Sequence, residues 1–318
     1  MEQPRWISAV EVRRAVGPNQ ARRLVQRALL DGFDPAGDPP RSSPTVHSGQ
    51  LLLMPSETPA AVGVKVLSVA PGNPERGRER IQALYVLMDP ETLTPSILLD
   101  GTAVTALRTP AVSALGMDAL APQQVSKVVI FGSGPQAIGH AEALLQLRCP
   151  EEFVVVARRP DACAAAAETI AALGFPARPV NADDRAAVEE AVRAAQVVVA
   201  ATSARTPVLD GDWVADGACV VAIGSHEPHR RELDSTLMQR SLVVVEDAAT
   251  ALREAGDVVM AVAEGTLDEK TLATLRDLAL GRVVRAEDRP NVFKTVGMSW
   301  EDLVIAEGVA RAVGAVGP

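Results

Sequence analysis

From residue 128 to about residue 245, short and continuously apolar runs alternate with longer alanine-rich segments. This pattern is typical of strands buried on both faces and of helices that connect them. We expect strands at Val128–Phe131, Phe153–Val156, Gln196–Ala200, Cys219–Ile223 and Leu242–Val245. We expect the connecting helices at Ile138–Leu147, Ala162–Leu173 and Arg185–Ala195. The alternation predicts an α/β protein with a doubly wound parallel sheet and right-handed crossovers.

The first 120 residues follow a different pattern, in which two helices precede a set of strands. The helices are expected at Ala9–Arg14 and Asn19–Asp31, and the strands at Leu51–Met54, Val62–Ser68 and Ile81–Asp89. A loop rich in Pro, Gly and Ser, residues 34–49, joins the two sets, and a helix at Val104–Leu120 leads into the parallel sheet. The mixture predicts a separate α+β domain.

After residue 246 the pattern becomes helical again. Helices are expected at Ala248–Glu254, Leu267–Leu278 and Ser299–Val313. The last one is amphipathic, so we expect it to pack back on the first domain. The predicted division is therefore residues 1–120 with the C-terminal segment 295–318 as one domain, and residues 121–294 as the other.

A glycine-rich turn stands between the strand at residue 128 and the helix that follows it. Gly132 allows the tight turn, Gly134 lets a pyrophosphate approach the backbone, and the small Ala137 lets the helix pack closely on the strand. The helix N-terminus would then face the phosphates. Because the strand and helix context is present, the sequence predicts a dinucleotide-binding Rossmann unit. Its candidate cofactor-binding residues are Gly132, Ser133, Gly134, Pro135, Gln136 and Ala137.

The end of the second strand of this unit bears on which nucleotide is bound. Sites that prefer NAD place an acidic residue there to bind the ribose hydroxyls. This chain has Ala157 at that point, followed by Arg158 and Arg159. The two arginines suit the 2′-phosphate of NADP, so NADP(H) is favoured, and NAD(H) stays open. A charged pair after a strand is also an ordinary solvated turn.

Composition excludes several classes of partner. The net charge of -9 and the absence of a basic block argue against nucleic acid and against an anionic membrane surface. The three cysteines, Cys149, Cys163 and Cys219, form no paired motif, which predicts reduced thiols without a disulfide or a zinc site. No apolar run approaches the roughly 20 residues of a membrane helix, and the N-terminus lacks a signal-peptide pattern. We therefore expect a cytoplasmic protein.

Three cations of the first domain occur where the chain is otherwise apolar or turn-like: Arg41, Lys65 and Arg108. Paired guanidinium groups can hold a carboxylate, and a lysine beside them can exchange a proton with an imine or amine nitrogen if neighbouring cations lower its pKa. Each has a simpler interpretation as well. Lys65 lies in an alternating strand that could turn it to solvent, and Arg108 could be a surface helix residue.

These residues belong to a longer set of motifs that follow one another in a characteristic order. The set comprises Arg41, Leu52-Leu-Met-Pro55, Gly63-Val-Lys65-Val, Pro71-Gly-Asn-Pro74, Ile81-Gln82-Ala83, Leu99-Asp-Gly-Thr102, Thr105-Ala-Leu-Arg108-Thr, Gly132-Ser-Gly-Pro-Gln-Ala137, Arg231-Glu-Leu-Asp234 and Phe293-Lys-Thr-Val-Gly297. In these motifs the chain resembles the ornithine cyclodeaminase/mu-crystallin family over nearly its whole length.

The resemblance implies roles for several residues. Arg41 and Arg108 would hold the carboxylate of a small α-imino or α-amino acid, and Lys65 would contact the substrate near the reacting carbon. Thr202 and Ser203 would contact the cofactor. The first domain would bind substrate and carry the interface of a homodimer. The family pattern also matches Gln82, Thr102 and Lys294, to which the sequence assigns no chemistry.

One position departs from the family pattern. In ornithine cyclodeaminases the residue matching His226 looks to be an aspartate that binds the side-chain amine of ornithine. An imidazole is a competent proton carrier but a poor counter-ion for an alkylammonium group, so cyclodeamination is in doubt. His226 could instead only cap a loop. A metal pair with His229 is not predicted, because no third ligand is nearby.

Taken with the resemblance, these residues predict an NAD(P)H-dependent oxidoreductase that reduces the C=N bond of a small α-imino acid. Lys65, Arg108 and His226 would be its catalytic residues. Ornithine cyclodeaminase, which converts ornithine to proline and ammonia with recycled NAD, is the alternative. A nucleotide-binding protein with little turnover is the second alternative.

Overall fold

The computed structural model describes residues 3–315. Contacts within the chain divide it into two compact units. Unit 1 is drawn from Met1–Val112 and Met298–Pro318, and unit 2 is Ser113–Gly297. Helix α3 (Gly101–Leu120) begins in unit 1 and ends in unit 2, and the predicted division at residue 120 falls at its C-terminal end.

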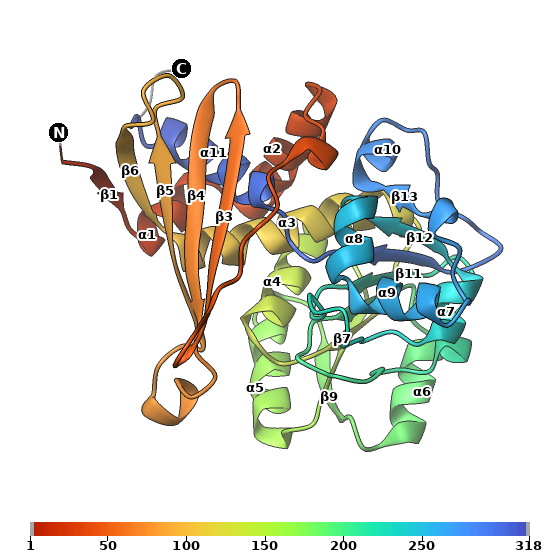
Figure 1. Ribbon diagram of the computed structural model, residues 1–318. Helices are drawn as coiled ribbons and strands as arrows, with labels where there is room; N and C mark the ends of the chain where they lie inside the picture. The colour runs from red at the N-terminus through yellow and green to blue at the C-terminus, as the bar shows by residue number, and fades with distance from the viewer. Residues whose placement is uncertain (1–2, 316–318) are drawn as a thin grey trace. The chain divides into compact units, whose positions relative to one another are not determined.

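Unit 1 combines one sheet with helices (Figure 1). Its six strands are β1 (Arg5–Ile7), β2 (Thr45–Val46), β3 (Gly49–Thr58), β4 (Ala61–Val69), β5 (Ile81–Met88) and β6 (Pro95–Asp100), in the order β1-β6-β5-β4-β3-β2. Only the β1–β6 pair is parallel. The helical elements are α1 (Ala9–Ala15), α2 (Pro18–Leu30), η1 (Pro35–Gly37), η2 (Pro74–Arg76), the first part of α3 and α11 (Ser299–Ala312).

The two faces of this sheet differ. On β4 the buried positions alternate with half-buried ones, as expected for a strand with one covered face. Helix α11 packs against β3, β4 and β5. On the opposite face an apolar row runs across five strands in register, from Trp6 through Leu98, Val86 and Val64 to Pro55. These side chains keep part of their surface exposed, and Trp6 is 52% exposed.

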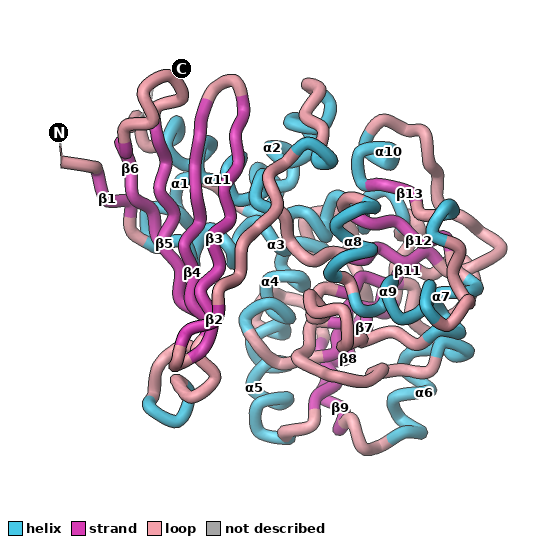
Figure 2. The backbone as a smooth tube through the Cα atoms, viewed as in Figure 1, coloured by secondary structure: helices cyan, strands magenta, loops and turns pink. Residues whose placement is uncertain are grey.

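Unit 2 is built on eight parallel strands, drawn in magenta in Figure 2. They are β7 (Lys127–Phe131), β8 (Glu152–Ala157), β9 (Ala177–Asn181), β10 (Val197–Ala200), β11 (Cys219–Ala222), β12 (Leu242–Val245), β13 (Ala273–Thr274) and β14 (Asn291–Lys294). The order β13-β12-β14-β11-β10-β7-β8-β9 reverses direction between β7 and β10. In open α/β sheets such a switch point lies where the ligand binds. The predicted doubly wound fold is confirmed.

The helices of unit 2 mostly match the expected connections. They are α4 (Pro135–Leu144), α5 (Pro160–Ala171), α6 (Arg185–Arg193), η3 (Gly211–Trp213), α7 (Ser235–Arg240), α8 (Ala248–Glu254), α9 (Gly256–Ala263), η4 (Glu269–Thr271) and α10 (Leu275–Ala279). The central strands are buried along their length, and their valines form the core with the facing helices. This explains why the strands are apolar at consecutive positions.

The prediction of a single helix at Leu267–Leu278 is wrong. The segment holds η4, then β13 beside β12, and only then α10. The helix starts late because Thr274 is its N-cap, and the Thr274 hydroxyl accepts a hydrogen bond from the Asp277 backbone N–H at 3.1 Å. A hydroxyl in this role favours a helix start over a helix interior.

Candidate functional site

Lys65 lies on the buried face of the unit 1 sheet. The alternation along β4 places it with Gly63 and Leu67 against the helices, and only 1% of its surface is exposed. The simpler interpretation of Lys65 as a solvent-facing strand residue is therefore wrong. A lysine at full burial requires a charge partner, because an isolated ammonium is costly to remove from water.

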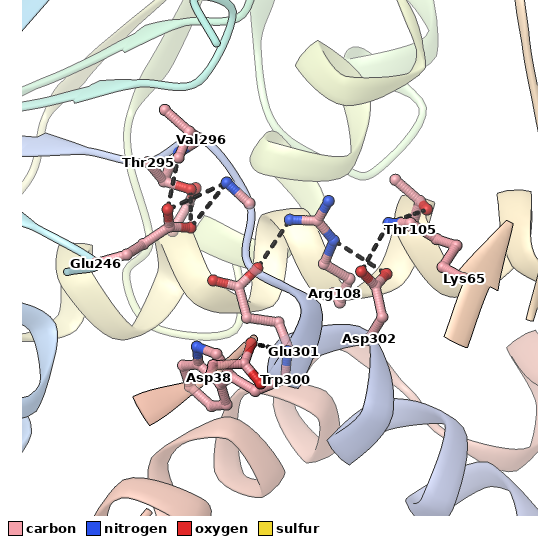
Figure 3. Close-up of polar contacts among 12 residues, drawn as sticks. Asp38, Lys65, Thr105, Arg108, Glu246, Thr295, Val296, Trp300, Glu301 and Asp302 are labelled. Carbon is pink, nitrogen blue, oxygen red and sulfur yellow. Dashed lines mark hydrogen bonds and ion pairs between the residues drawn. The ribbon is translucent and has the colours of Figure 1, made fainter. Parts of the chain in front are cut away.

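The partner is a carboxylate from the other end of the chain. The Lys65 Nζ donates to Asp302 Oδ2 at 2.6 Å and to Thr105 Oγ1 at 3.3 Å. Arg108 Nη1 donates to Glu301 Oε2 at 2.8 Å, and Arg108 Nε lies 3.3 Å from Asp302 Oδ1. Figure 3 shows Asp302 reaching both cations and Glu301 reaching Arg108. Lys65 and Arg108, two of the three cations selected from the sequence, thus meet at one carboxylate.

The pKa of Lys65 is lowered to about 8. Burial is the main cause, because it disfavours the charged form. The Asp302 carboxylate opposes this effect, and the Arg108 guanidinium adds to it. The sequence analysis attributes the lowering to neighbouring cations, whereas the structure gives burial the larger part.

Helix α11 supplies both carboxylates from its first turn. Asp38 anchors that end of the helix: its Oδ2 accepts from the Trp300 backbone N–H at 3.0 Å, and its Oδ1 accepts from the Ser56 hydroxyl at 2.6 Å. The fully buried Trp300 ring packs on Phe33, with 5.3 Å between ring centroids. A carboxylate at the N-terminus of a helix satisfies amides that have no partner within the helix. Burial raises the pKa of Asp38 to about 6 against these hydrogen bonds.

Sequence reasoning missed Glu301, Asp302 and Asp38. Acidic residues in the first turn of a helix are ordinary, since they face the positive end of the helix dipole. The available signal was the position of Glu301 and Asp302 inside an otherwise apolar run, Ser299-Trp-Glu-Asp-Leu-Val-Ile-Ala. A buried pair of acids in such a run requires buried cations elsewhere in the fold.

Arg41 lies in the loop that precedes β2 and is half-buried. The bridge between Ser42 and Leu53 places Arg41 level with Met54, and Met54 pairs with Lys65. Two strand spacings separate the Arg41 and Lys65 backbones, which is about 10 Å. Arg41 therefore stands in the same row of the sheet as Lys65.

The predicted glycine turn in unit 2 has the required backbone. Gly132 has φ +115°, and a Cβ at this position would overlap with the carbonyl oxygen of Ala201. Gly134 is the N-cap of α4 without a side-chain cap, and a Cβ there would meet open space. Ala137 is fully buried. A tight turn, an uncapped helix start and free space beside it fit a dinucleotide pyrophosphate.

The other predicted residues of this turn have structural roles that are compatible with that fit. Pro135 occupies the first position of α4, where the missing N–H costs nothing, and Ser133 is half-buried in the turn. The Gln136 carbonyl accepts from His140 Nδ1 at 2.7 Å, and His140 Nε2 lies 2.8 Å from the Ser113 hydroxyl. Burial lowers the pKa of His140 to about 4, so its imidazole is neutral at pH 7.

Arg158 and Arg159 follow β8 and are both exposed. Arg159 is also the N-cap residue of α5 and makes no side-chain cap. The pair stands at the carboxyl end of the second strand of the unit, as the sequence predicts.

Thr202 follows β10 and is held by Glu232, which the family motif contains but the sequence analysis did not interpret. The fully buried Glu232 accepts from the Thr202 N–H at 2.8 Å, from the Thr202 hydroxyl at 2.6 Å and from the Gly224 N–H at 2.6 Å. It therefore ties the ends of β10 and β11 together. Thr202 also accepts from the Ala204 N–H, so its hydroxyl already has a donor and an acceptor. Ser203 beside it is exposed.

A buried ion pair, Lys294 with Asp257, holds the backbone at Glu232 in place. Lys294, at the end of β14, lies 3.0 Å from Asp257 Oδ2, and both side chains are fully buried. The other Asp257 oxygen accepts from the Glu232 and Leu233 backbone N–H groups at 2.7 and 2.8 Å. Lys294, to which the sequence assigned no chemistry, thus has a structural role: through Asp257 it helps to fix Glu232 at the ends of β10 and β11. Burial raises the pKa of Glu232, and Lys294 opposes this.

Glu246 holds the segment that follows β14. Its carboxylate accepts from the Thr295 hydroxyl, from the Val296 N–H at 2.8 Å and from the Gly297 N–H at 3.1 Å (Figure 3). Gly297 has φ +79°, a value that favours glycine. The polar groups of the motif Phe293-Lys-Thr-Val-Gly297 thus have a structural role, because they bind the carboxylates of Asp257 and Glu246.

His226 lies in the loop after β11 and is exposed. His229 is exposed too, and its Nε2 lies 3.2 Å from Glu227 Oε2. Among residues 3–315 no group of three His, Cys, Asp or Glu side chains is arranged to hold a metal ion. Within the same residues no helix has the length and apolarity needed to cross a bilayer.

Unit 2 thus has the fold and the glycine turn of a dinucleotide-binding protein, and unit 1 holds a buried lysine–arginine–carboxylate cluster. The sequence profile of the ornithine cyclodeaminase/mu-crystallin family matches residues 10–314. The chain belongs to this family, as the sequence motifs indicated.

Individual relatives match most of the chain. The ketimine reductase mu-crystallin of Mus musculus is 32% identical over 265 residues, which cover 82% of this chain and 80% of the relative. The Δ(1)-pyrroline-2-carboxylate reductase of Thermococcus litoralis, solved with NADH and L-proline, has a TM-score of 0.90 at 29% identity, over 97% of each chain. An archaeal alanine dehydrogenase dimer with bound NAD has a TM-score of 0.89 at 27% identity, over 99% of this chain and 98% of its own.

Proposed function

We propose that this protein is an NAD(P)H-dependent oxidoreductase that reduces the C=N bond of a small α-imino acid, of the ketimine reductase or amino-acid dehydrogenase type. The observation that carries the proposal is the buried contact of Lys65 with Asp302, beside Arg108. Family membership supports it, since relatives named for ketimine and pyrroline-2-carboxylate reduction share most of the chain.

Lys65 is suited to give a proton to the substrate nitrogen. A pKa of about 8 keeps most of the amine protonated at neutral pH and makes the ammonium a better acid than a lysine in water. An ammonium has three N–H donors. Two of them reach Asp302 and Thr105, and within residues 3–315 Nζ has no third acceptor. The third N–H is the one we assign to the imine.

Arg108 and Arg41 would hold the substrate carboxylate. A guanidinium offers a planar fork of donors that matches a carboxylate. The contacts of Arg108 with Glu301 and Asp302 fix the plane of its guanidinium, so a bound carboxylate would be fixed in orientation as well. Arg41 stands in the same sheet row as Lys65 and would add the second cation. His226, exposed in its loop, is the proposed proton carrier to solvent.

A nicotinamide cofactor would supply the hydride that the imine carbon accepts. The residues of unit 2 that would hold it are Gly132, Ser133, Gly134, Pro135, Gln136, Ala137, Arg158, Arg159, Thr202 and Ser203. We favour NADP(H), and NAD(H) stays open, because β8 ends at Ala157 in place of an acid and two exposed arginines follow it directly. The double variant Arg158→Ala/Arg159→Ala should raise KM for NADPH and leave KM for NADH nearly unchanged. Equal losses for both nucleotides would refute this assignment.

The activity is tested by following NADPH and NADH oxidation with imino acids. Suitable substrates are Δ(1)-pyrroline-2-carboxylate, and pyruvate or oxaloacetate with ammonia or methylamine. We expect turnover with at least one imine, and a loss of roughly 10²- to 10⁴-fold in Lys65→Met, the range of a lost general acid. Lys270→Met, at an exposed lysine, is the matched control. Proline formation from ornithine with catalytic NAD, and no imine turnover, would restore the cyclodeaminase interpretation.

We also propose that the protein is a homodimer joined through the open face of the unit 1 sheet. The apolar row from Trp6 to Pro55 supports this, since an exposed apolar row that crosses five of the six strands marks an interaction surface. Light scattering should give twice the chain mass for the wild type and the chain mass for Val64→Asp. A monomeric wild type at micromolar concentration would contradict it. A cytoplasmic location is proposed as well, supported by the unpaired Cys149, Cys163 and Cys219.

A further inference from the structure

We propose that Asp302 is a positioning residue for the reduction, which aims the Lys65 ammonium at the substrate nitrogen and keeps it charged until the proton is transferred. This rests on the proposed function. It goes beyond it by assigning a role to a residue that the sequence motifs leave out.

Asp302 contacts both cations of the cluster. Asp302 Oδ2 accepts from Lys65 Nζ at 2.6 Å, while Asp302 Oδ1 lies 3.3 Å from Arg108 Nε. One rigid carboxylate therefore fixes the relative positions of the proposed proton donor and the proposed carboxylate-binding cation. Thr105 sets the second direction at Nζ, and its own hydroxyl donates to the Gly101 carbonyl at 2.8 Å. Because the ammonium nitrogen is tetrahedral, fixing two of its N–H bonds also fixes the direction of the third.

Helix α11, which carries Asp302, is anchored at its N-terminal end. The N-terminal end of α11 is held by the hydrogen bond from Trp300 N–H to Asp38 and by the packing of Trp300 on Phe33. Sites on anchored helices are held more tightly than sites on loops. Since Asp302 is two residues from Trp300 in the same turn, its carboxylate inherits this rigidity.

The charges around Lys65 act on its pKa in opposite directions. The charged and titratable groups that face Lys65 are Asp302 and Glu301 of α11, Arg108 of α3, and its cross-strand neighbour Tyr85 of β5. Burial and Arg108 both disfavour the ammonium, whereas Asp302 is the largest group that favours it. Burial also raises the pKa of Tyr85 well above its ordinary value, so Tyr85 stays neutral and contributes no charge. Without Asp302 the amine would lose its proton at a lower pH.

The test uses Asp302→Asn, which keeps the shape and removes the charge. In the wild type, kcat/KM for imine reduction should fall as pH rises through the pKa of Lys65. In Asp302→Asn this alkaline limb should move down by roughly one pH unit or more, the effect of losing one close opposite charge. Asp302→Glu should restore the wild-type limb, and Glu307→Gln, on the same helix, should not move it. An unmoved limb in Asp302→Asn would overturn the proposal.

A second measurement needs no turnover. The chain has four lysines, Lys65, Lys127, Lys270 and Lys294, so labelling lysine with ¹³C at Cε gives few resonances, and a Lys65→Arg variant identifies one of them. The Lys65 resonance should titrate at lower pH in Asp302→Asn than in the wild type. Identical titrations would overturn the coupling even in an inactive protein. A shifted titration in a protein that reduces no imine would sustain the Lys65–Asp302 coupling and refute the proposed function instead.

Discussion

Burial of Lys65 should leave a signature in the pH dependence of stability. The pKa of this amine is about 8 in the folded protein, against 10.5 in water. Between these values the unfolded chain binds more protons than the folded one, so the free energy of unfolding rises with pH. The stabilisation is absent below pH 8 and complete above pH 10.5.

The size of the effect follows from the two pKa values. Between pH 7.5 and 9.5 the wild type should gain about 2 kcal/mol of stability relative to Lys65→Met, which has no amine at this position. Exposed carboxylates are ionised throughout this range, and Tyr85 is present in both proteins, so the difference between the two curves reports the Lys65 amine together with its ion pair.

The assay is urea unfolding of wild type and Lys65→Met at half-unit pH intervals from 7.5 to 9.5, at one protein concentration. Lys270→Met, which removes an exposed lysine, should run parallel to the wild type. Curves of wild type and Lys65→Met that stay parallel over the whole range would show that the folded-state amine titrates as in water. The account of Lys65 as a buried acid of lowered pKa would then be refuted.

Three further substitutions test other parts of the structure. Gly132→Ala should lose nucleotide binding, measured by fluorescence titration of NADPH, because the new Cβ would overlap with the Ala201 carbonyl at a positive φ. Glu232→Gln should lower the thermal midpoint, by a cost of roughly 1–3 kcal/mol, and raise KM for the nucleotide, since one of its three donors loses its acceptor. Gly63→Ala should destabilise by roughly 1–3 kcal/mol in urea, because the added methyl meets the buried Tyr85 hydroxyl. A Gly63→Ala protein of wild-type stability would show that the Tyr85 ring moves aside at little cost.

Local pattern was sufficient for elements whose signal lies in neighbouring residues. Strand β7, the turn at Gly132 and helix α4 follow one another, so the apolar run, the glycine spacing and the small Ala137 all appear within a few residues. The alternation along β4 was equally visible. It did not say which face is buried, because that depends on helix α11, more than two hundred residues away.

Elements that depend on distant partners were missed. Strand β14 lies between β11 and β12, but no strand was predicted there, because its two ends are the polar residues Asn291 and Lys294. Their polarity is satisfied only in the fold, where Lys294 pairs with Asp257 and the Asn291 amide binds the Ala286 backbone. Glu301 and Asp302 were missed for the same reason, because their partners Lys65 and Arg108 are far away in the sequence.

Unit 1 is discontinuous in the chain, and this sets an order of events during synthesis. Lys65 and Arg108 leave the ribosome early, whereas their carboxylate partners on α11 follow only after all of unit 2, Ser113–Gly297. Unit 2 is a continuous segment and can fold while α11 is still being made. During that interval Lys65 and Arg108 have no counter-ions, so burying them would be costly and we expect unit 1 to stay unfolded. A nascent chain stalled before α11 should therefore have a protease-resistant nucleotide unit and a protease-sensitive first hundred residues.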